Sequence, residues 1–459
     1  ASPKLLNESF IRSIEGVEQV IKLDHGIGIL ATSIEVGLKT KLQLQIESSE
    51  TKVTTHNSEA DMADYENADG NEKIVVNEGK VDDEMLNAAT TYQANSTNAY
   101  VYHAQMEPLN AVVSVSKDKK SAELWIGSQS PDGAKSAVAK KLGIQISEVT
   151  VNQLYLGGGF GRRSMADYAS ECAALAKTTE QPVKLIWTRE DDIQYGAFRP
   201  QCLQQLKAGV NRKGMITAWS HKSIGPGGGL LGGSDMSHYV IPNKTFILKS
   251  IDHGAGKFAI EAFIDQIARA QNRDPYAYRV ELMSQDDKAR KVLEKVGQIS
   301  NWKSARENGK GRGIAFADRD SYTAGVAEIS VDRNTGVIKV HKFWVAIDAG
   351  VIVQPDNATA QIEGAITMGI SSALKEQITF KSGKVEQSNF HDYPILRMSE
   401  SPDSIEVAFI ESTNAPTGMG EAALPLVGGS IASAFAALTG KYLYNMPFTP
   451  ERVLEVLKA

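Results

Sequence analysis

The chain has 459 residues, of which 42% are hydrophobic and 23% are charged, as in an ordinary globular protein with a sizeable core. Its formal net charge of −6 argues against bulk binding of nucleic acid or anionic membranes, because both require a basic surface. The two cysteines, Cys172 and Cys202, are too few for a disulfide framework or for the thiolate set of an iron–sulfur cluster. No apolar run predicts a membrane span, and the N-terminus, ASPKLLNESF, lacks the pattern of a signal peptide.

The first half of the chain predicts a small N-terminal unit, a linker and a larger domain. Residues 1–50 alternate helix and strand patterns, and residues 51–87 are polar and acidic, as in a mobile loop or linker. Residues 88–245 predict several strands, a hairpin turn in KDKK, and a helix that begins at Pro131 and is stopped by Gly143. A further hairpin is predicted in CLQQLKAGVNRKGMITAWSHKSIG.

The second half, residues 246–459, predicts another domain of mixed helices and strands. KFAIEAFIDQIARAQN has the apolar spacing of a helix packed on a core, and GRGIAFADRDSYTAGVAEISVDRNTGVIKVHKFWVAIDAG predicts consecutive strands. Helices of small residues are predicted in ATAQIEGAITMGISSAL and in SIASAFAALTGK. Because strands and helices alternate without strict βαβ repetition, we predict the α+β fold class with mixed layers.

The stretch LYLGGGFGRR, residues 154–163, predicts a strand, a glycine turn and, directly after it, a helix. Gly157–Gly159 carry no Cβ, so their N–H groups can approach a ligand closely, and Arg162 and Arg163 can pair with phosphate or carboxylate. Two interpretations stay open, namely an anion or cofactor site at the helix N-terminus and a tight turn with solvated arginines. A Walker loop is excluded because no Gly-Lys-Ser/Thr ending is present, and Arg162 breaks the dinucleotide-binding fingerprint.

Glu421, in TGMGEAALP, is the candidate for acid–base chemistry. It lies between glycines and an apolar helix, where a fixed carboxylate could act as a general base, and the alternative is a surface glutamate at a helix start. Gln129 could hydrogen-bond a ligand or cap a turn, and Gln361 could be a polar core group. Further polar clusters occur in YHAQMEPLN and NFHDYP. No histidine spacing is typical of a metalloprotease, so no metal is assigned to side chains.

Taken in order, these stretches resemble the molybdopterin-binding large subunit of the xanthine dehydrogenase/aldehyde oxidase family, and within it the bacterial isoquinoline 1-oxidoreductase beta-subunit type. The resemblance runs through YHAQMEPLN, SQSPDGA, LYLGGGFGRR, VKLIWTREDDIQYGAFRPQ, KFAIEAFIDQIA, VAIDAGVIVQPD, AQIEGAITMGISSAL, VEQSNFHDYPILRM and MGEAALP. It covers residues 95–459, and residues 1–50 resemble the later part of the family's hammerhead domain.

The resemblance implies two molybdopterin-binding domains, residues 88–245 and 246–459, that hold a molybdenum–pterin cofactor as molybdopterin or its cytosine dinucleotide form. It implies hydroxylation or oxidation of a small aldehyde or N-heteroaromatic substrate, with Glu421 as the general base. Electrons would pass to an iron–sulfur small subunit within a heteromeric complex. The implied cofactor contacts are Gln129, Gly157, Gly158, Gly159, Phe160, Gly161, Arg162, Gln361 and Gly420.

Two departures from the family pattern keep a second hypothesis open. The family's N-terminal region is not present in this sequence, so a second chain would have to supply it. The segment ILKSIDHGAGKFA, residues 247–259, is also shorter than in relatives and lacks an arginine that borders the cofactor. The alternative is therefore a non-catalytic or degenerate paralogue with a structural or cofactor-handling role. Exported relatives favour the periplasm, and the cytoplasm is the other compartment left open.

Overall fold

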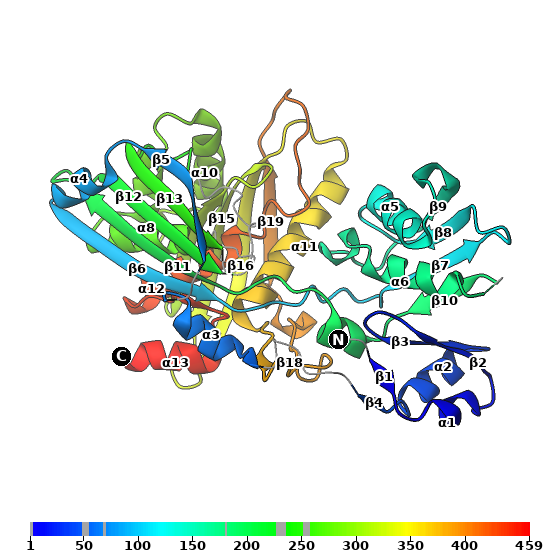
Figure 1. Ribbon diagram of the computed structural model, residues 1–459. Helices are drawn as coiled ribbons and strands as arrows, with labels where there is room; N and C mark the ends of the chain where they lie inside the picture. Colours follow the sequence, from blue (N-terminus) through cyan, green and yellow to red (C-terminus); the bar gives the residue numbers. More distant parts are fainter. Residues whose placement is uncertain (1–2, 48–54, 68–69, 180, 226–235, 251–257) are drawn as a thin grey trace. The chain divides into compact units, whose positions relative to one another are not determined.

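Figure 1 shows the computed structural model of the chain, which describes residues 3–47, 55–67, 70–179, 181–225, 236–250 and 258–459. The chain forms two compact units, each assembled from separate stretches of sequence. Unit 1 consists of Ala1–Ser58, His103–Ala197 and Phe380–Asn389, and unit 2 consists of Glu59–Tyr102, Phe198–Thr379 and Phe390–Ala459. The boundary expected at residue 245 falls inside unit 2, within a single strand, β13 (Asn243–Ser250).

Unit 1 is built on a four-stranded sheet. Its elements are β1 (Lys4–Leu5), α1 (Glu8–Arg12), β2 (Val17–Lys22), β3 (Ile27–Ala31), α2 (Ile34–Lys41), β4 (Ile46–Glu47), β7 (Asn110–Val115), β8 (Ala122–Ile126), α5 (Pro131–Leu142), η2 (Ile146–Glu148), β9 (Val149–Gln153), η3 (Arg162–Ser164), α6 (Asp167–Ala176), β10 (Val183–Ile186), α7 (Arg189–Tyr195), β17 (Phe380–Lys381) and β18 (Lys384–Val385). The sheet order is β10-β7-β8-β9, in which only β8 and β9 run parallel. Helices α5 and α6 pack on this sheet and enclose its apolar core.

Unit 2 contains a six-stranded and a four-stranded sheet, with eight α-helices among its described residues. Its elements are α3 (Ser58–Asp64), β5 (Asn71–Glu78), α4 (Val81–Leu86), β6 (Thr90–Asn98), β11 (Cys202–Val210), β12 (Ile216–Gly225), β13, α8 (Phe258–Ala270), α9 (Pro275–Leu282), α10 (Asp287–Ile299), β14 (Lys310–Ala317), β15 (Tyr322–Val331), β16 (Ile338–Asp348), α11 (Pro355–Leu374), η4 (Met398–Glu400), β19 (Ser404–Phe409), α12 (Leu426–Thr439), β20 (Asn445–Met446) and α13 (Pro450–Lys458). The sheet orders are β20-β6-β11-β12-β13-β5 and β14-β15-β16-β19.

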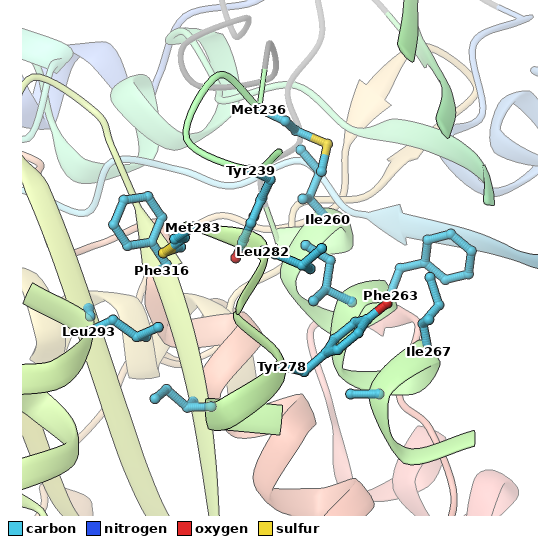
Figure 2. Packing of buried hydrophobic residues seen from close by; sticks show 14 of the residues in the cluster. Met236, Tyr239, Ile260, Phe263, Ile267, Tyr278, Leu282, Met283, Leu293 and Phe316 are labelled. Atoms are coloured by element: carbon cyan, nitrogen blue, oxygen red, sulfur yellow. The ribbon is translucent and has the colours of Figure 1, made fainter. Parts of the chain in front are cut away.

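A shared apolar core joins the two sheets of unit 2. Helix α8 contacts strands β6 and β11 of the larger sheet, strand β14 of the smaller sheet and helix α12. Figure 2 shows Ile260, Phe263 and Ile267 of α8 in the same cluster as Tyr278 of α9 and Phe316 of β14. Helix α12 approaches β14 closely because Gly313 has no side chain, and an added Cβ there would lie 2.0 Å from the Ala434 nitrogen.

The structure confirms the α+β class and most of the predicted elements, but the linker predicted for residues 51–87 is wrong in part. Residues 71–78 form strand β5, which pairs antiparallel with β13 at the edge of the six-stranded sheet. An edge strand needs only backbone hydrogen bonds on one side, and nearly all side chains of β5 are exposed. Its polar and acidic composition is therefore compatible with a strand, although it is typical of a loop.

A buried histidine in the larger sheet makes unit 2 sensitive to acid. His221 is 1% exposed, and its Nε2 lies 2.8 Å from Gln204 Oε1. Burial lowers the pKa of His221 to about 3. As the pH falls below about 6.5, this histidine is therefore protonated in the unfolded chain but stays neutral in the folded chain. Stability from this group is therefore present above pH 6.5 and is lost as the pH falls toward the folded-state pKa.

We expect the free energy of unfolding to fall by about 2 kcal/mol between pH 7 and pH 5 because of His221. The measurement is urea unfolding at both pH values for the native protein, for His221→Gln and for a control, His391→Gln, whose side chain is 74% exposed. The His221→Gln protein should lack this part of the pH dependence, and the control should keep it. A pH dependence that is the same in all three proteins would contradict the prediction.

Some predicted features fall outside the described residues. They include residues 251–257 of the shortened segment before α8. In the part of the chain that is described, no helix combines the length and apolar character needed to cross a membrane.

Candidate functional site

The glycine motif of unit 1 forms a loop between β9 and η3 whose backbone requires glycine. Gly158 and Gly161 both have φ near +94°, a conformation that side chains with a Cβ rarely adopt. The N–H of Gly157 donates to Glu107 Oε2 at 2.7 Å, and the N–H of Gly161 donates to Gln129 Oε1 at 3.0 Å. An added Cβ at Gly159 would lie 2.4 Å from Gln129 Oε1. The loop is therefore shaped by two acceptor side chains from neighbouring segments.

Glu107 was noted only as part of a polar cluster, but it is central to this loop. It accepts hydrogen bonds from Gly157, from Asn110 Nδ2 at 3.0 Å and from Arg163 Nη2 at 2.9 Å. Partial burial raises the pKa of Glu107, but these hydrogen bonds and the charge of Arg163 outweigh it, so the pKa lies below its ordinary value. The carboxylate stays charged at neutral pH and holds the loop to the segment before β7.

The two arginines of the motif point into the protein. Arg162 and Arg163 are both fully buried. The Arg162 guanidinium donates to Asp167 at 2.7 and 2.8 Å and to Asp192 at 2.9 Å. Arg163 donates to the carbonyl oxygens of Gly158, Gly127 and Pro108. The interpretation of the two arginines as solvated is therefore wrong. The expected contact between Arg162 and the cofactor stays a prediction, and the Arg162 guanidinium already has two carboxylate partners.

The helix after the glycine motif begins later than the sequence predicted. Helix α6 starts at Asp167, and the short 3₁₀ turn Arg162–Ser164 separates it from the loop. Asp167, in the first turn of α6, pairs with Arg162. A helix N-terminus directly behind the glycines is therefore absent, and the loop offers its own N–H groups instead.

Several donors of the loop have no acceptor within the described part of the chain. The N–H groups of Gly158 and Gly159 and the Nε2 of Gln129 donate to none of the described residues, although Gly159 is buried. Buried N–H groups are almost always hydrogen-bonded. These donors fit a ligand that presents oxygen atoms, such as the oxo and phosphate oxygens of a molybdenum–pterin cofactor.

The candidate base of unit 2, Glu421, lies in the loop before α12. Its side chain is 37% exposed and faces two guanidinium groups, with Arg319 Nη2 2.9 Å from Oε2 and Arg199 Nη2 3.9 Å from Oε1. Glu421 does not lie at the start of a helix, because α12 begins only at Leu426. The arginines fix the position of the carboxylate while its exposure leaves it accessible.

Side chains from a neighbouring turn hold the Glu421 loop in place. Ser321, in the turn between β14 and β15, donates to the Gly418 carbonyl at 2.7 Å and lies 2.6 Å from Thr417 Oγ1. Thr323 donates to the Ala422 carbonyl at 2.9 Å. On the other side, Gln361 Nε2 of α11 donates to the Gly420 carbonyl at 2.8 Å. The loop is thus fixed on both sides of Glu421.

Gln361 and Gly420 differ from the rest of the loop. Gln361 is exposed, so it is not the polar core group that the sequence suggested. Gly420 is also exposed, and an added Cβ there would meet no atom within 4 Å. Internal packing therefore gives no reason for glycine at position 420, which agrees with close approach of a ligand as the reason.

The remaining polar clusters have structural partners. His103 Nδ1 lies 3.1 Å from the Ala197 carbonyl. Tyr393 is buried and donates to Glu376 at 2.9 Å, and its oxygen accepts from the Tyr102 N–H. Burial raises the pKa of Glu376 above its ordinary value. No group of three or more histidine, cysteine or acidic side chains in the described ranges is arranged to hold a metal ion.

A family model for a molybdopterin cofactor-binding domain matches residues 65–250, and a second such model matches residues 251–402. Together they cover residues 65–402, a range that includes the glycine loop and ends before the Glu421 loop. The chain belongs to the molybdopterin-binding subunits of the xanthine dehydrogenase/aldehyde oxidase family. The family resemblance seen in the sequence is thereby confirmed, and so is the cofactor class.

Individual relatives of this molybdopterin-binding subunit agree. Isoquinoline 1-oxidoreductase subunit beta from Brevundimonas diminuta is 29% identical over 98% of this chain and 63% of its own length. The membrane-bound aldehyde dehydrogenase from Gluconacetobacter polyoxogenes is 30% identical over 94% of this chain and 63% of its own length. The chain thus spans less than two thirds of the length of these relatives.

Solved structures support the fold of the molybdopterin-binding subunit. Quinoline 2-oxidoreductase from Pseudomonas putida 86 superposes with a TM-score of 0.86 at 14% identity, covering 100% of this chain and 94% of the other. Aldehyde oxidoreductase from Desulfovibrio gigas superposes with a TM-score of 0.85 at 15% identity, covering 100% of this chain and 76% of the other. At these identities the likeness establishes the fold.

Proposed function

We propose that the chain is the molybdopterin-binding subunit of a molybdenum-dependent oxidoreductase that hydroxylates or oxidises an aldehyde or an N-heteroaromatic compound. The names of the relatives, which include isoquinoline 1-oxidoreductase and aldehyde dehydrogenase, support this substrate class. The observation that carries the proposal is the glycine loop, whose Gly158, Gly159 and Gln129 donors lack acceptors among the described residues.

In this proposal the two loops have different roles. The donors of Gly158, Gly159 and Gln129 would hydrogen-bond oxygen atoms of the cofactor. Gly420, in the loop of Glu421, is a separate proposed contact, where a backbone without a Cβ admits close approach of a ligand. The bound cofactor supplies a molybdenum centre that takes two electrons from the substrate. Glu421 would accept the proton at its carboxylate oxygen, because its loop is fixed by neighbouring side chains and the carboxylate is still accessible.

The electrons need a partner, because Cys172 and Cys202 are both buried and cannot hold an iron–sulfur cluster between them. We therefore propose that an iron–sulfur small subunit accepts the electrons within a heteromeric complex. A further chain would belong to the complex if a separate gene encodes the part of the relatives that this chain does not match. The family resemblance alone supports a periplasmic location, which cell fractionation would test.

A glycine substitution tests cofactor binding directly. Gly158→Ala places a Cβ at φ +94° and 2.8 Å from the Phe160 ring, so the loop must change shape. Gly143→Ala is the matched control, because Gly143 also has positive φ but ends α5 with no atom within 4 Å of an added Cβ. We expect Gly158→Ala to lose most of its molybdenum while Gly143→Ala keeps it.

The measurement is molybdenum per chain, by elemental analysis, on protein purified from its own host with the polypeptides that co-purify. About one metal per chain is the expected stoichiometry for one cofactor per subunit. A folded native chain without molybdenum in the presence of its partners would overturn the proposed function in favour of a non-catalytic paralogue. Equal molybdenum in Gly158→Ala and in the control would remove the assigned role of the loop.

A further inference from the structure

Arg319 lies beside the candidate base and is unlike the buried arginines of the protein. Its Nη2 forms an ion pair with Glu421 Oε2 at 2.9 Å, but none of its N–H groups makes an aligned hydrogen bond to a described residue. Its side chain is 38% exposed. A guanidinium has a planar fork of donors that matches a carboxylate, and most of this capacity is unused here.

The buried arginines of the same protein provide the contrast. Arg279 is fully buried and donates to Glu261 Oε2 at 2.9 Å and to the carbonyl oxygens of Glu261 and Pro275. Arg162 is likewise saturated by Asp167 and Asp192. These side chains are saturated within the core, whereas the Arg319 guanidinium is partly exposed at the surface of unit 2.

The backbone that carries Arg319 is fixed. The turn between β14 and β15 is anchored by Ser321 to Thr417 and Gly418. Gly418 also packs so closely on Asp320 that an added Cβ would lie 2.8 Å from its Cβ. The guanidinium is therefore presented from a rigid turn, and only its own side-chain torsions are free to change. A recognition residue gains affinity from this kind of preorganisation.

The charges around Glu421 favour an anion once Glu421 is protonated, because two arginines then face only the carboxylate of Asp320. Arg319 and Arg199 supply two positive charges, and Asp320 Oδ2 lies 3.9 Å from Arg319 Nε. When Glu421 accepts a proton, the carboxylate charge that faces both arginines disappears. A negatively charged group on the substrate would then compensate the positive charge of the two arginines, whereas a neutral substrate would not.

We infer that Arg319 is a substrate-recognition residue that binds a carboxylate, so that the preferred substrate is an aldehyde or N-heteroaromatic compound bearing a carboxylate group. This inference rests on the proposed function, because it assumes that the reaction takes place at Glu421. The substrate carboxylate replaces Glu421 in the ion pair with Arg319, and Glu421 is then released to accept the proton. No covalent bond changes in this exchange.

The test uses two probes of nearly equal size, 4-carboxybenzaldehyde and 4-formylbenzamide, which differ in one negative charge. The proteins are the molybdenum-loaded complex, its Arg319→Gln variant and a control, Arg333→Gln, which removes an exposed arginine from the turn between β15 and β16. We expect Arg319→Gln to lower kcat/KM for the charged aldehyde by about 10–100-fold, since a hydrogen-bonded charged group is lost. The value for the neutral amide should fall by less than this, since only the ion pair between Arg319 and Glu421 is then lost, and the control should match the native protein.

A binding measurement without turnover accompanies the kinetics. Calorimetry with benzoate and with benzamide should show weaker benzoate binding in Arg319→Gln and unchanged benzamide binding. Equal losses for charged and neutral probes would mean that Arg319 only positions Glu421, and no loss for either would mean that it does not contact the substrate; both results overturn the inference. If the molybdenum-loaded native complex oxidises neither of the two aldehydes nor any N-heterocycle, the proposed function fails. The benzoate titration then still decides whether Arg319 binds carboxylates.

Discussion

Replacing Glu421 with glutamine is expected to lower kcat by about 10²–10⁴-fold while the molybdenum content stays the same. Glutamine keeps the shape of the side chain and can still hydrogen-bond Arg319, but its amide cannot accept the proton. The loop should keep its structure, because Ser321, Thr323 and Gln361 hold it through neighbouring backbone carbonyls and not through Glu421. Steady-state kinetics with an aldehyde substrate, paired with elemental analysis, measure both quantities.

The control for this change is Glu411→Gln, which removes an exposed carboxylate just after β19 in the same unit. Its kcat should equal that of the native protein. Loss of a general base should lower kcat by at least about 100-fold. If Glu421→Gln retains more than about a tenth of the native kcat, Glu421 is not the general base. A simultaneous loss of molybdenum would instead identify Glu421 as a residue needed for cofactor retention.

The second large effect is expected from Arg162→Met, which should lower the free energy of unfolding by about 3–5 kcal/mol. Methionine fills part of the volume but removes the guanidinium that neutralises Asp192, whose side chain is 1% exposed. Gln105 also donates to Asp192, but an amide cannot replace a positive charge. Denaturant unfolding of unit 1, followed by a signal from Trp187 over which Arg162 stacks, reports the change.

Arg212→Met is the matched control, because Arg212 lies exposed in the hairpin turn between β11 and β12. Its effect should stay within about 0.5 kcal/mol, as for most surface substitutions. The comparison also decides between two roles for Arg162. Normal stability combined with loss of molybdenum would show that Arg162 binds the cofactor, whereas lost stability would show that it supports the glycine loop from within.

Local sequence patterns were enough to predict most elements. The helix from Pro131 to Gly143 has a proline in its first turn and a glycine at φ +79° after its last residue, which are strong start and stop signals. Strand β5 was missed because an exposed edge strand has no apolar alternation to reveal it. Likewise, α6 starts at Asp167, which forms an ion pair with Arg162, and no local pattern predicts such a pair.

Among the residues at the two loops, the sequence pointed to the glycines, Gln129, Gln361 and Glu421. Those residues stand in motifs that are recognisable within ten residues of sequence. The same loops are contacted by Glu107, Arg319 and Arg199, each of which comes from a segment distant in sequence. No local motif distinguishes these three residues from other charged residues. Charged residues in turns are usually solvated, so only the packing of β14 and β15 against the Glu421 loop reveals Arg319.

The interleaving of the two units has a consequence for anyone who would express a part of this protein. The chain passes from one unit to the other after residues 58, 102, 197, 379 and 389. A gene truncated near residue 245 would encode β6, β11 and β12 without α8, so the larger sheet would expose its apolar face to water. A single proteolytic cut cannot release either unit, because each consists of three separate stretches of the chain. To express one unit alone, the gene segments that encode its three stretches would have to be joined.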